Sequence, residues 1–195
     1  MKVLYQSCLA TLILAVILCG IYPALVTVAG KLLFAEKANG GLISNHEGNV
    51  IGAEIIGQSF SKPIYFHGRP SAAGDKGYDA ANSSGTNLGP TNQKLIDGIS
   101  KNIDDLLKDN PSLKKGQIPT DLVTASASGL DPHISPEAAY VQVERVASAR
   151  GVSVDEIRNL AKEHIEGPAW GLFGEPVVNV LLLNLDLDRR YPPKG

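Results

Sequence analysis

The chain has 195 residues, 44% hydrophobic side chains and a formal net charge of −2 at pH 7. This length is enough for one domain with a real core. Since the charges are nearly balanced and form no basic stripe, nucleic acid is not an expected partner. The composition of the whole chain conceals one asymmetry, because residues 3–30 carry no charge.

This uncharged stretch predicts a membrane helix. As a helix it would be about 42 Å long, against a bilayer hydrocarbon core of about 30 Å. A cleaved signal peptide is the alternative, but its apolar core would run for only about 7–15 residues. We therefore expect an uncleaved anchor at 1–34, with the span at about 8–30, and a soluble domain at 35–195.

Two features of the anchor bear on its shape and its contacts. Pro23 leaves the carbonyl of Cys19 without its helical donor, which predicts a kink. Gly20 and Ala24 lie one turn apart, and small residues at this spacing permit close packing with another helix. Gly20, Pro23 and Ala24 are therefore the candidate residues for helix packing in the membrane.

The side of the membrane on which the soluble part lies is weakly indicated. Lys2 on one side of the span faces Lys31 and Lys37 on the other, so the positive-inside count is indecisive. The two cysteines, Cys8 and Cys19, both lie in the anchor. A soluble part without cysteine is compatible with an extracytoplasmic space, which is our expectation.

The soluble part predicts one mixed α/β (α+β) domain with a β-hairpin, about three helices and a buried C-terminal strand. LISN and VIGAEII flank the turn HEGN and predict the hairpin. Apolar residues at three- and four-residue spacing predict a helix at 91–108, followed by a short strand at DLVTAS. Capping patterns predict helices opening at Ser135 and at Ser153. Residues 177–188 read as a strand, buried over 177–182 and half exposed after that.

The stretch FHGRPSAAGDKGYDAANSSGTNLGPTN at 66–92 is unusually long for a loop, and such loops are generally functional or disordered. It lacks the GxxxxGK motif followed by Ser or Thr that defines a phosphate-binding P-loop. Arg69 could pin the loop through carbonyl groups or contact a partner. Asn82, Ser83 and Asn87 offer adaptable hydrogen bonds to another protein.

Catalytic and metal sites have weaker support in the sequence. Ser126 or Ser128 could form a hydrolase triad with Asp131 and His133, but no GxSxG elbow is present. Turns and a helix cap explain the same residues. No metal site is expected, because the histidines are scattered: His46, His67, His133 and His164.

Seven segments together resemble the KdpC family, the C subunits of the Kdp potassium-transporting P-type ATPase. They cover nearly the whole chain: IYPALVT in the anchor, NGGLI at 39–43, IGQSF at 56–60, YFHGRPSA at 65–72, NLGPTN at 87–92, LVTASASGLDPHISPEAA at 122–139 and GEPVVNVLLLNLDLD at 174–188.

The resemblance implies an accessory, non-catalytic subunit of an inner-membrane complex, with a pore subunit, a catalytic ATPase subunit and the lipid bilayer as partners. One mechanism attached to such subunits raises the ATP affinity of the catalytic subunit, with nucleotide contacts at Thr124, Ser126, Ser128 and Gly129. The other places the domain outside the cytoplasm over the pore subunit, where it stabilises the assembly. For this placement we expect a partner surface at Arg69, Asn82, Ser83, Asn87 and His133. We favour the outer placement, with no firmly bound cofactor and ATP reached only through the catalytic subunit.

Two alternatives belong to other classes of protein. The first is a membrane-anchored extracytoplasmic hydrolase that uses Ser128 and His133. The second is a pilin-like filament subunit, which would carry a glutamate early in its apolar helix. Position 5 is Tyr5 and no acid precedes Glu36, so the pilin interpretation has little support.

Overall fold

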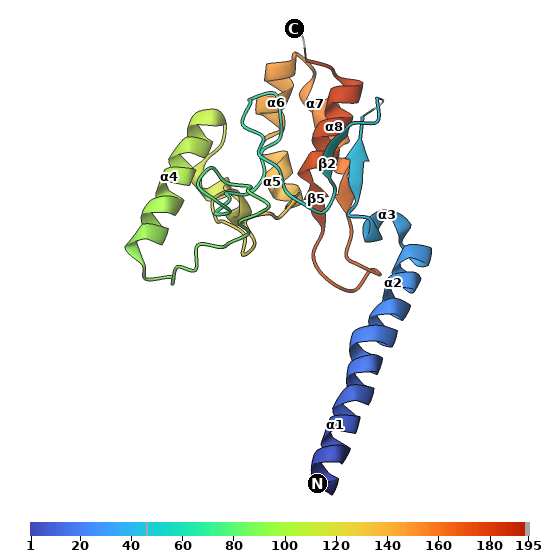
Figure 1. Cartoon of the computed structure of the whole chain (residues 1–195). Coiled ribbons are helices and arrows are strands. Elements are labelled where there is room, and N and C mark those ends of the chain that lie inside the picture. The colour runs from blue at the N-terminus through green and yellow to red at the C-terminus, as the bar shows by residue number, and fades with distance from the viewer. Residues whose placement is uncertain (46, 194–195) are drawn as a thin grey trace. The chain divides into compact units, whose positions relative to one another are not determined.

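A computed structural model describes residues 1–45 and 47–193 (Figure 1). His46, one of the histidines considered as a ligand, lies outside the described residues. The chain divides into two compact units, Met1–Ile51 and Gly52–Gly195. We call the second unit the head and describe each unit by itself.

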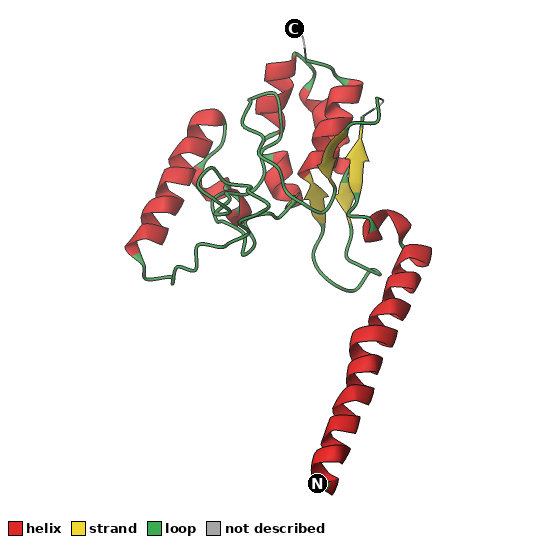
Figure 2. Cartoon of the chain, viewed as in Figure 1, coloured by secondary structure: helices red, strands yellow, loops and turns green. Residues whose placement is uncertain are grey.

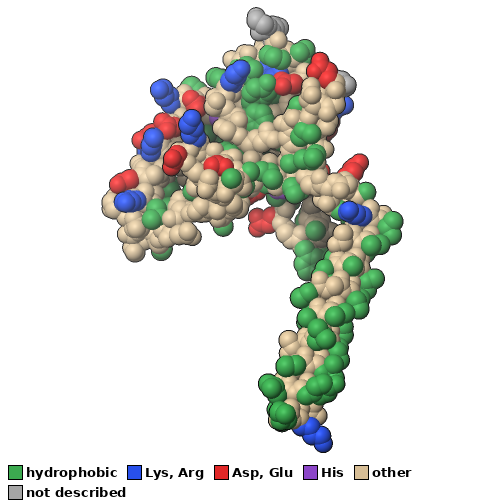
Figure 3. Space-filling model, viewed as in Figure 1, with side chains coloured by type: hydrophobic (Ala, Val, Ile, Leu, Met, Phe, Trp, Pro, Cys, Tyr) green, Lys and Arg blue, Asp and Glu red, His purple; other side chains and the backbone are tan. Residues whose placement is uncertain are grey.

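The N-terminal unit begins with a continuous apolar helix over Lys2–Leu33, whose most apolar window has a mean hydropathy of 2.5. It comprises α1 (Lys2–Ala15), a π-helical segment (Val16–Ile21) and α2 (Tyr22–Leu33). Hydrophobic side chains line its visible face in the space-filling view (Figure 3). By length and composition this helix could cross a bilayer.

The π-helical segment ends two residues before Pro23. At its end the backbone N–H of Tyr22 donates to the carbonyl of Ile17, five residues earlier. Short π-helical turns of this kind are common irregularities in long helices and are one recognised cause of bends. The helix is therefore irregular just before Pro23, and the kink expected there stays a prediction.

After the long helix come α3 (Ala35–Ala38) and the predicted hairpin, in which β1 (Leu42–Ser44) pairs with β2 (Val50–Ala53). The Oδ1 atom of Asn45 accepts from the backbone N–H groups of Glu47 and Asn49 at 3.0 and 2.9 Å. This side chain therefore fixes the start of the turn, as Asn commonly does.

The head contains a three-stranded antiparallel sheet in the order β3-β5-β4. Ile134 and Ile165 both pair with Val178, which places Val178 at the centre of the sheet. Figure 2 shows that helices and long loops make up most of the remainder. The remaining elements are α4 (Gln93–Asp109), two 3₁₀ turns (Lys115–Gln117 and Thr120–Leu122), β3 (His133–Ile134), α5 (Pro136–Tyr140), α6 (Val143–Arg150), α7 (Val154–Glu163), β4 (Ile165–Glu166), β5 (Val177–Asn179) and α8 (Val180–Arg190).

One hydrophobic core joins this sheet to α5, α6, α7 and α8. Its largest fully buried apolar side chains include Phe66, Ile134, Ile157, Leu160, Leu183 and Leu187, and α4 contributes no fully buried residue. Phe66 is the contribution of the glycine-rich loop, so the first residue of that loop is a core residue.

The predicted helices are present, with one interruption. Asn92 caps α4 by accepting from the N–H of Lys94 at 2.9 Å. Ser135 caps α5 and Ser153 forms the expected capping box of α7. The helix expected to run from Ser135 to Arg150 is divided between α5 and α6, and the fully buried Gln142 lies at the division.

The prediction of a strand over 177–188 is right only for β5 and wrong for the residues after it, which form α8. Asn179 caps this helix by accepting from the N–H of Leu182 at 3.1 Å. Val180, Leu183, Asn184 and Leu187 follow the three- and four-residue helical spacing and are all buried. The alternation of Leu with polar residues is real, but the cap and the helical spacing determine the structure.

The strand expected at DLVTAS is also wrong. Residues Thr120–Leu122 form a 3₁₀ turn. The backbone N–H and the side-chain hydroxyl of Thr124 both donate to the carbonyl of Thr120, at 3.0 and 2.8 Å. Such local bonds compete with strand pairing, so the β-branched residues here close a turn instead.

Candidate functional site

Two buried amides clamp the beginning of the glycine-rich loop 66–92 to the head. Asn184 on α8 accepts from the N–H of Phe66 and donates to its carbonyl, both at 2.9 Å. Gln142 does the same for His67, at 2.8 and 3.1 Å. Each side chain satisfies both backbone groups of one residue, as a neighbouring strand would. The loop therefore leaves the core from a fixed position.

Ser71 organises the middle of the loop. Its hydroxyl donates to the carbonyl of Gly129 at 2.6 Å and accepts from the N–H groups of Ala73 and Tyr78 at 3.2 and 2.7 Å. The Tyr78 hydroxyl donates in turn to the carbonyl of Arg69 at 2.5 Å. Burial, followed by the nearby negative charge of Asp131, raises the pKa of Tyr78 to about 12, so it stays a neutral donor.

The far part of the loop lies along segment 126–131. The hydroxyl of Ser83 and the N–H of Ser84 both donate to the carbonyl of Ser128, at 2.9 and 3.0 Å. The two backbones approach so closely that a Cβ on Gly129, which has a φ of +67°, would lie 2.6 Å from the carbonyl oxygen of Ser84. Only glycine fits this position without strain.

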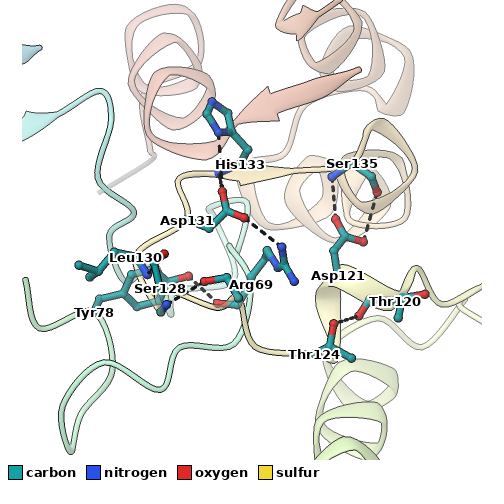
Figure 4. Close-up of polar contacts among 12 residues, drawn as sticks. Arg69, Tyr78, Thr120, Asp121, Thr124, Ser128, Leu130, Asp131, His133 and Ser135 are labelled. Carbon is teal, nitrogen blue, oxygen red and sulfur yellow. Dashed lines mark hydrogen bonds and ion pairs between the residues drawn. The ribbon is translucent and has the colours of Figure 1, made fainter. Parts of the chain in front are cut away.

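Arg69 and His133, two of the predicted contact residues, meet at Asp131. The guanidinium of Arg69 lies 2.9 Å from one carboxylate oxygen, and Nδ1 of His133 lies 3.7 Å from the other (Figure 4). The Asp131 carboxylate raises the pKa of His133 more than burial lowers it. Burial opposes ionisation of Asp131, but His133 and Arg69 outweigh it and lower the pKa of the carboxyl group. Arg69 therefore pins the loop to the turn before β3.

A groove of about 620 Å³ opens beside this ion pair. Among the described residues, its charged lining consists of one guanidinium, from Arg69, and four carboxylates, from Asp121, Asp131, Glu137 and Glu175. His133 also lines it. An excess of carboxylates repels a phosphate chain, so the groove is poorly suited to a nucleotide triphosphate.

The predicted nucleotide residues are occupied with internal hydrogen bonds. The Ser126 hydroxyl accepts from the N–H of Gly129 at 2.9 Å, and the Ser128 hydroxyl accepts from the N–H of Leu130 at 3.1 Å. Thr124 bonds back to Thr120 (Figure 4). These bonds close successive turns and use the N–H groups of Thr124, Gly129 and Leu130, whereas a phosphate cradle needs N–H groups that are free to point at the ligand.

Ser128 and His133 do not form a nucleophile–base pair. In Figure 4 the His133 ring lies on the far side of Asp131 from Ser128. Within the described part of the chain, the hydrogen bonds of the two side chains do not connect them. Activation of a serine needs such a contact, so the geometry gives the hydrolase alternative no support.

The remaining predicted contact residues are exposed on the pinned loop. Asn82 is held by its side-chain bond to Asp79 at 2.6 Å, and Asn87 adopts a positive φ of 52°. Ser83 is also exposed, although its hydroxyl reaches Ser128. Together with Arg69 and His133 they define what we call the loop surface. It can supply polar contacts from a fixed backbone.

Sequence comparison identifies the family of the chain. The family model for KdpC, described as "K+-transporting ATPase, c chain", matches residues 4–189. A protein of Nitratidesulfovibrio vulgaris named "Potassium-transporting ATPase KdpC subunit" is 54% identical over 94% of this chain and 92% of its own length. Proteins of the same name from Koribacter versatilis and Myxococcus xanthus are 51% and 48% identical over 98% and 96% of this chain, and over 96% and 87% of their own lengths. The chain belongs to the KdpC family.

Two arginines that hold this KdpC head together were missed in the sequence. Arg145 donates to the carbonyls of Pro63 and Tyr65 at 2.6 and 2.9 Å. Arg150 has a buried side chain and donates to Ile64, Tyr191 and Asp188. Both read as ordinary polar positions of a helix, and the backbone carbonyls to which they donate lie 41 to 86 residues away. No local signal marks them.

The KdpC chain also has the titratable side chains that a metal site would need, but they are dispersed. In residues 1–45 and 47–193, no three His, Cys, Asp or Glu side chains gather closely enough to hold an ion. His164 pairs with Asp186 at 3.0 Å, and Asp186 is shared with Arg189 and Arg190. These groups form an ion-pair network at the end of α8.

Proposed function

We propose that this chain is an accessory, non-catalytic subunit of a Kdp potassium-transporting ATPase and that its head works by docking onto a partner subunit. The observation that carries the proposal is the loop surface. A long glycine-rich loop, which could have been a mobile lid, is bonded to the head over residues 66–84 and keeps Asn82, Ser83 and Asn87 exposed. A preordered polar surface loses little conformational entropy on binding.

The proposed partner of the loop surface is the pore subunit, with the head outside the cytoplasm. The head has no cysteine, as suits an oxidising compartment. The groove beside Arg69 carries an excess of carboxylates, which is compatible with a partner facing cations rather than ATP. Any effect on ATP affinity would then pass through contacts with the catalytic subunit, and the bonds within 124–129 would serve the loop surface.

The test is co-purification of the pore and catalytic subunits with a tagged chain carrying Asn82→Arg. We expect a several-fold lower yield of complex, because a bulky charge enters the centre of the loop surface. Asn159→Arg is the matched control, since it places the same change on an exposed position of α7 and should leave the yield unchanged. Equal yields from Asn82→Arg and the wild type would refute docking through this surface.

The membrane helix supplies a second proposed contact. Gly20 and Ala24 lie on either side of Pro23 and leave room for another helix to approach closely. Gly20→Leu with Ala24→Leu should lower the yield of complex from membranes, whereas Ala10→Leu should not. An unchanged yield for the double variant would indicate that Gly20 and Ala24 face lipid and not another helix.

A further inference from the structure

The connection between β4 and β5 carries an exposed apolar tip. It runs over residues 167–176 and projects beyond the end of the sheet, drawn in orange (Figure 1). Trp170 is 91% exposed, Leu172 80% and Phe173 63%. Trp170 is the single tryptophan of the chain. Large apolar side chains grouped at one exposed point of a folded domain mark an interaction site more often than chance exposure does.

The backbone of this tip is held in a tight turn. Ala169 and Phe173 exchange two hydrogen bonds, at 2.8 and 3.0 Å, and the N–H groups of Gly171 and Leu172 donate to Pro168 and Ala169 at 2.9 and 3.2 Å. The rings of Trp170 and Phe173 meet edge to face, with centroids 6.2 Å apart. These bonds satisfy backbone groups that would otherwise resist transfer out of water. The tip is therefore ordered before it binds anything.

The charge pattern around the tip favours lipid over a charged ligand. Residues 167–174 contain no charged side chain, and the exposed Glu166 and Glu175 flank them. Attraction to anionic headgroups would need lysines or arginines at these positions. Tryptophan, by contrast, concentrates at membrane–water interfaces, because its ring is apolar and its N–H still finds a polar partner there.

The chain itself brings a bilayer within reach of the tip. The apolar helix ends at Leu33 and the head begins at Gly52. The 18 residues between them span at most about 60 Å, and a unit of the size of the head has a radius of gyration of about 15 Å. On either side of the membrane, this connecting segment holds the head at a high effective concentration beside the bilayer. Even a weak affinity for lipid is therefore sufficient for the tip to bind it.

We propose that the 167–176 turn is an interfacial membrane anchor, in which Trp170, Leu172 and Phe173 enter the headgroup region of the bilayer that contains the N-terminal helix. It provides a second point of attachment for the head. One attachment leaves a domain free to rotate about its tether, and a second restricts it to a narrow range of orientations. The proposal rests on the apolar helix and on the tip, and it is independent of docking through the loop surface.

Because Trp170 is the only tryptophan, its fluorescence reports the environment of the tip directly. The full chain is reconstituted into phosphatidylcholine vesicles, with either ordinary or brominated acyl chains. We expect a blue-shifted emission and a loss of intensity with brominated lipid. Leu172→Ser with Phe173→Ser should shift the emission to the red and reduce this quenching. Ile96→Ser, which changes another exposed apolar side chain of the head, should leave both signals as in the wild type.

Three further outcomes are decisive. Adding anionic lipid should not increase the quenching, and a strong increase would contradict an uncharged interfacial anchor. Free access of acrylamide to Trp170, with no quenching by brominated lipid, would overturn the proposal. In the purified Kdp complex, protection of Trp170 from both acrylamide and brominated lipid would show that a partner subunit covers the tip and would likewise overturn it.

Discussion

Individual polar side chains decide how the loop is joined to the core. Asn184 and Gln142 are fully buried, and their side-chain amides form hydrogen bonds with the backbone of Phe66 and His67. Arg150 does the same at the neighbouring Ile64. Unpaired, these groups would destabilise the core, but each finds its partners in the loop entry. The packing of the core and the position of the loop are therefore fixed by the same residues.

Arg150→Met should lower the free energy of unfolding by about 3 kcal/mol, because it leaves the carbonyls of Ile64 and Tyr191 without this donor and removes the ion pair with Asp188. Urea unfolding of the full chain in detergent, followed by circular dichroism, measures the change. Arg158→Met is the control, since Arg158 is exposed and its contact with Asp155 is 3.9 Å long. It should cost at most about 0.5 kcal/mol. Equal losses in the two variants would contradict the assigned role of Arg150.

His133 and His67 should give the head opposite pH dependences. The Asp131 carboxylate raises the pKa of His133 above 6.5, so its stabilising contribution is complete below pH 6.5 and is lost as the pH rises through the raised pKa. Burial, helped by Arg145, lowers the pKa of His67, so its contribution is present above pH 6.5 and is lost as the pH falls through the lowered pKa.

Unfolding free energies measured at a series of pH values on both sides of pH 6.5 test the two predictions. His133→Gln should remove a decline of stability on the alkaline side, and His67→Gln should remove a decline on the acid side. Each variant serves as the control for the other. The same change of slope in both would show that other groups control the pH dependence.

At the scale of elements, the main finding is that two loops stabilise each other. Segments 71–85 and 126–131 exchange hydrogen bonds through Ser71, Ser83 and Ser84 and pack closely at Gly129. Neither segment has a helix or strand of its own. The order of the loop surface therefore depends on contacts between distant parts of the chain.

Gly129→Ala should release the loop. The new Cβ would meet the carbonyl of Ser84 and the N–H of Ala73 at a positive φ, at a cost of about 2–4 kcal/mol. Hydrogen exchange should show a loss of protection in 71–85. Gly89→Ala is the matched control in the same loop, because Gly89 has open space around it and no positive φ. Unchanged exchange in the Gly129 variant would show that the loop is held by other means.

The sequence predicts the elements that carry local signals. The hairpin turn, the caps at Ser135 and Ser153 and the apolar face of α4 are all readable, and all are present. Residues 180–188 satisfy a two-residue and a helical period at once, and the Asn179 cap decides between them. The contact between loop 66–92 and segment 126–131 cannot be predicted from a repeating pattern in the sequence. It depends on single serines and glycines that lie 45 to 58 residues apart. Arg69 and His133 are predicted as partner contacts, which stays a prediction, and their shared contact with Asp131 appears only in three dimensions.

At the scale of the whole molecule, the chain combines an apolar helix with a head that carries exposed polar side chains on an ordered loop. This combination suits a subunit that acts through its neighbours, as the KdpC family assignment also indicates. We propose that the head works through protein contacts outside the cytoplasm, where it never meets cytoplasmic ATP.

The side of the membrane tests this claim most directly. A single cysteine is placed at Asn159, an exposed position of α7 that is not part of the loop surface, in a Cys8→Ser, Cys19→Ser background. Cells that express the complete complex are treated with an impermeant maleimide, with lysed cells as the reference for full access. Labelling in intact cells equal to that after lysis is the predicted result. Labelling only after lysis would place the head in the cytoplasm, contradict the account and return Thr124, Ser126, Ser128 and Gly129 to consideration as nucleotide contacts.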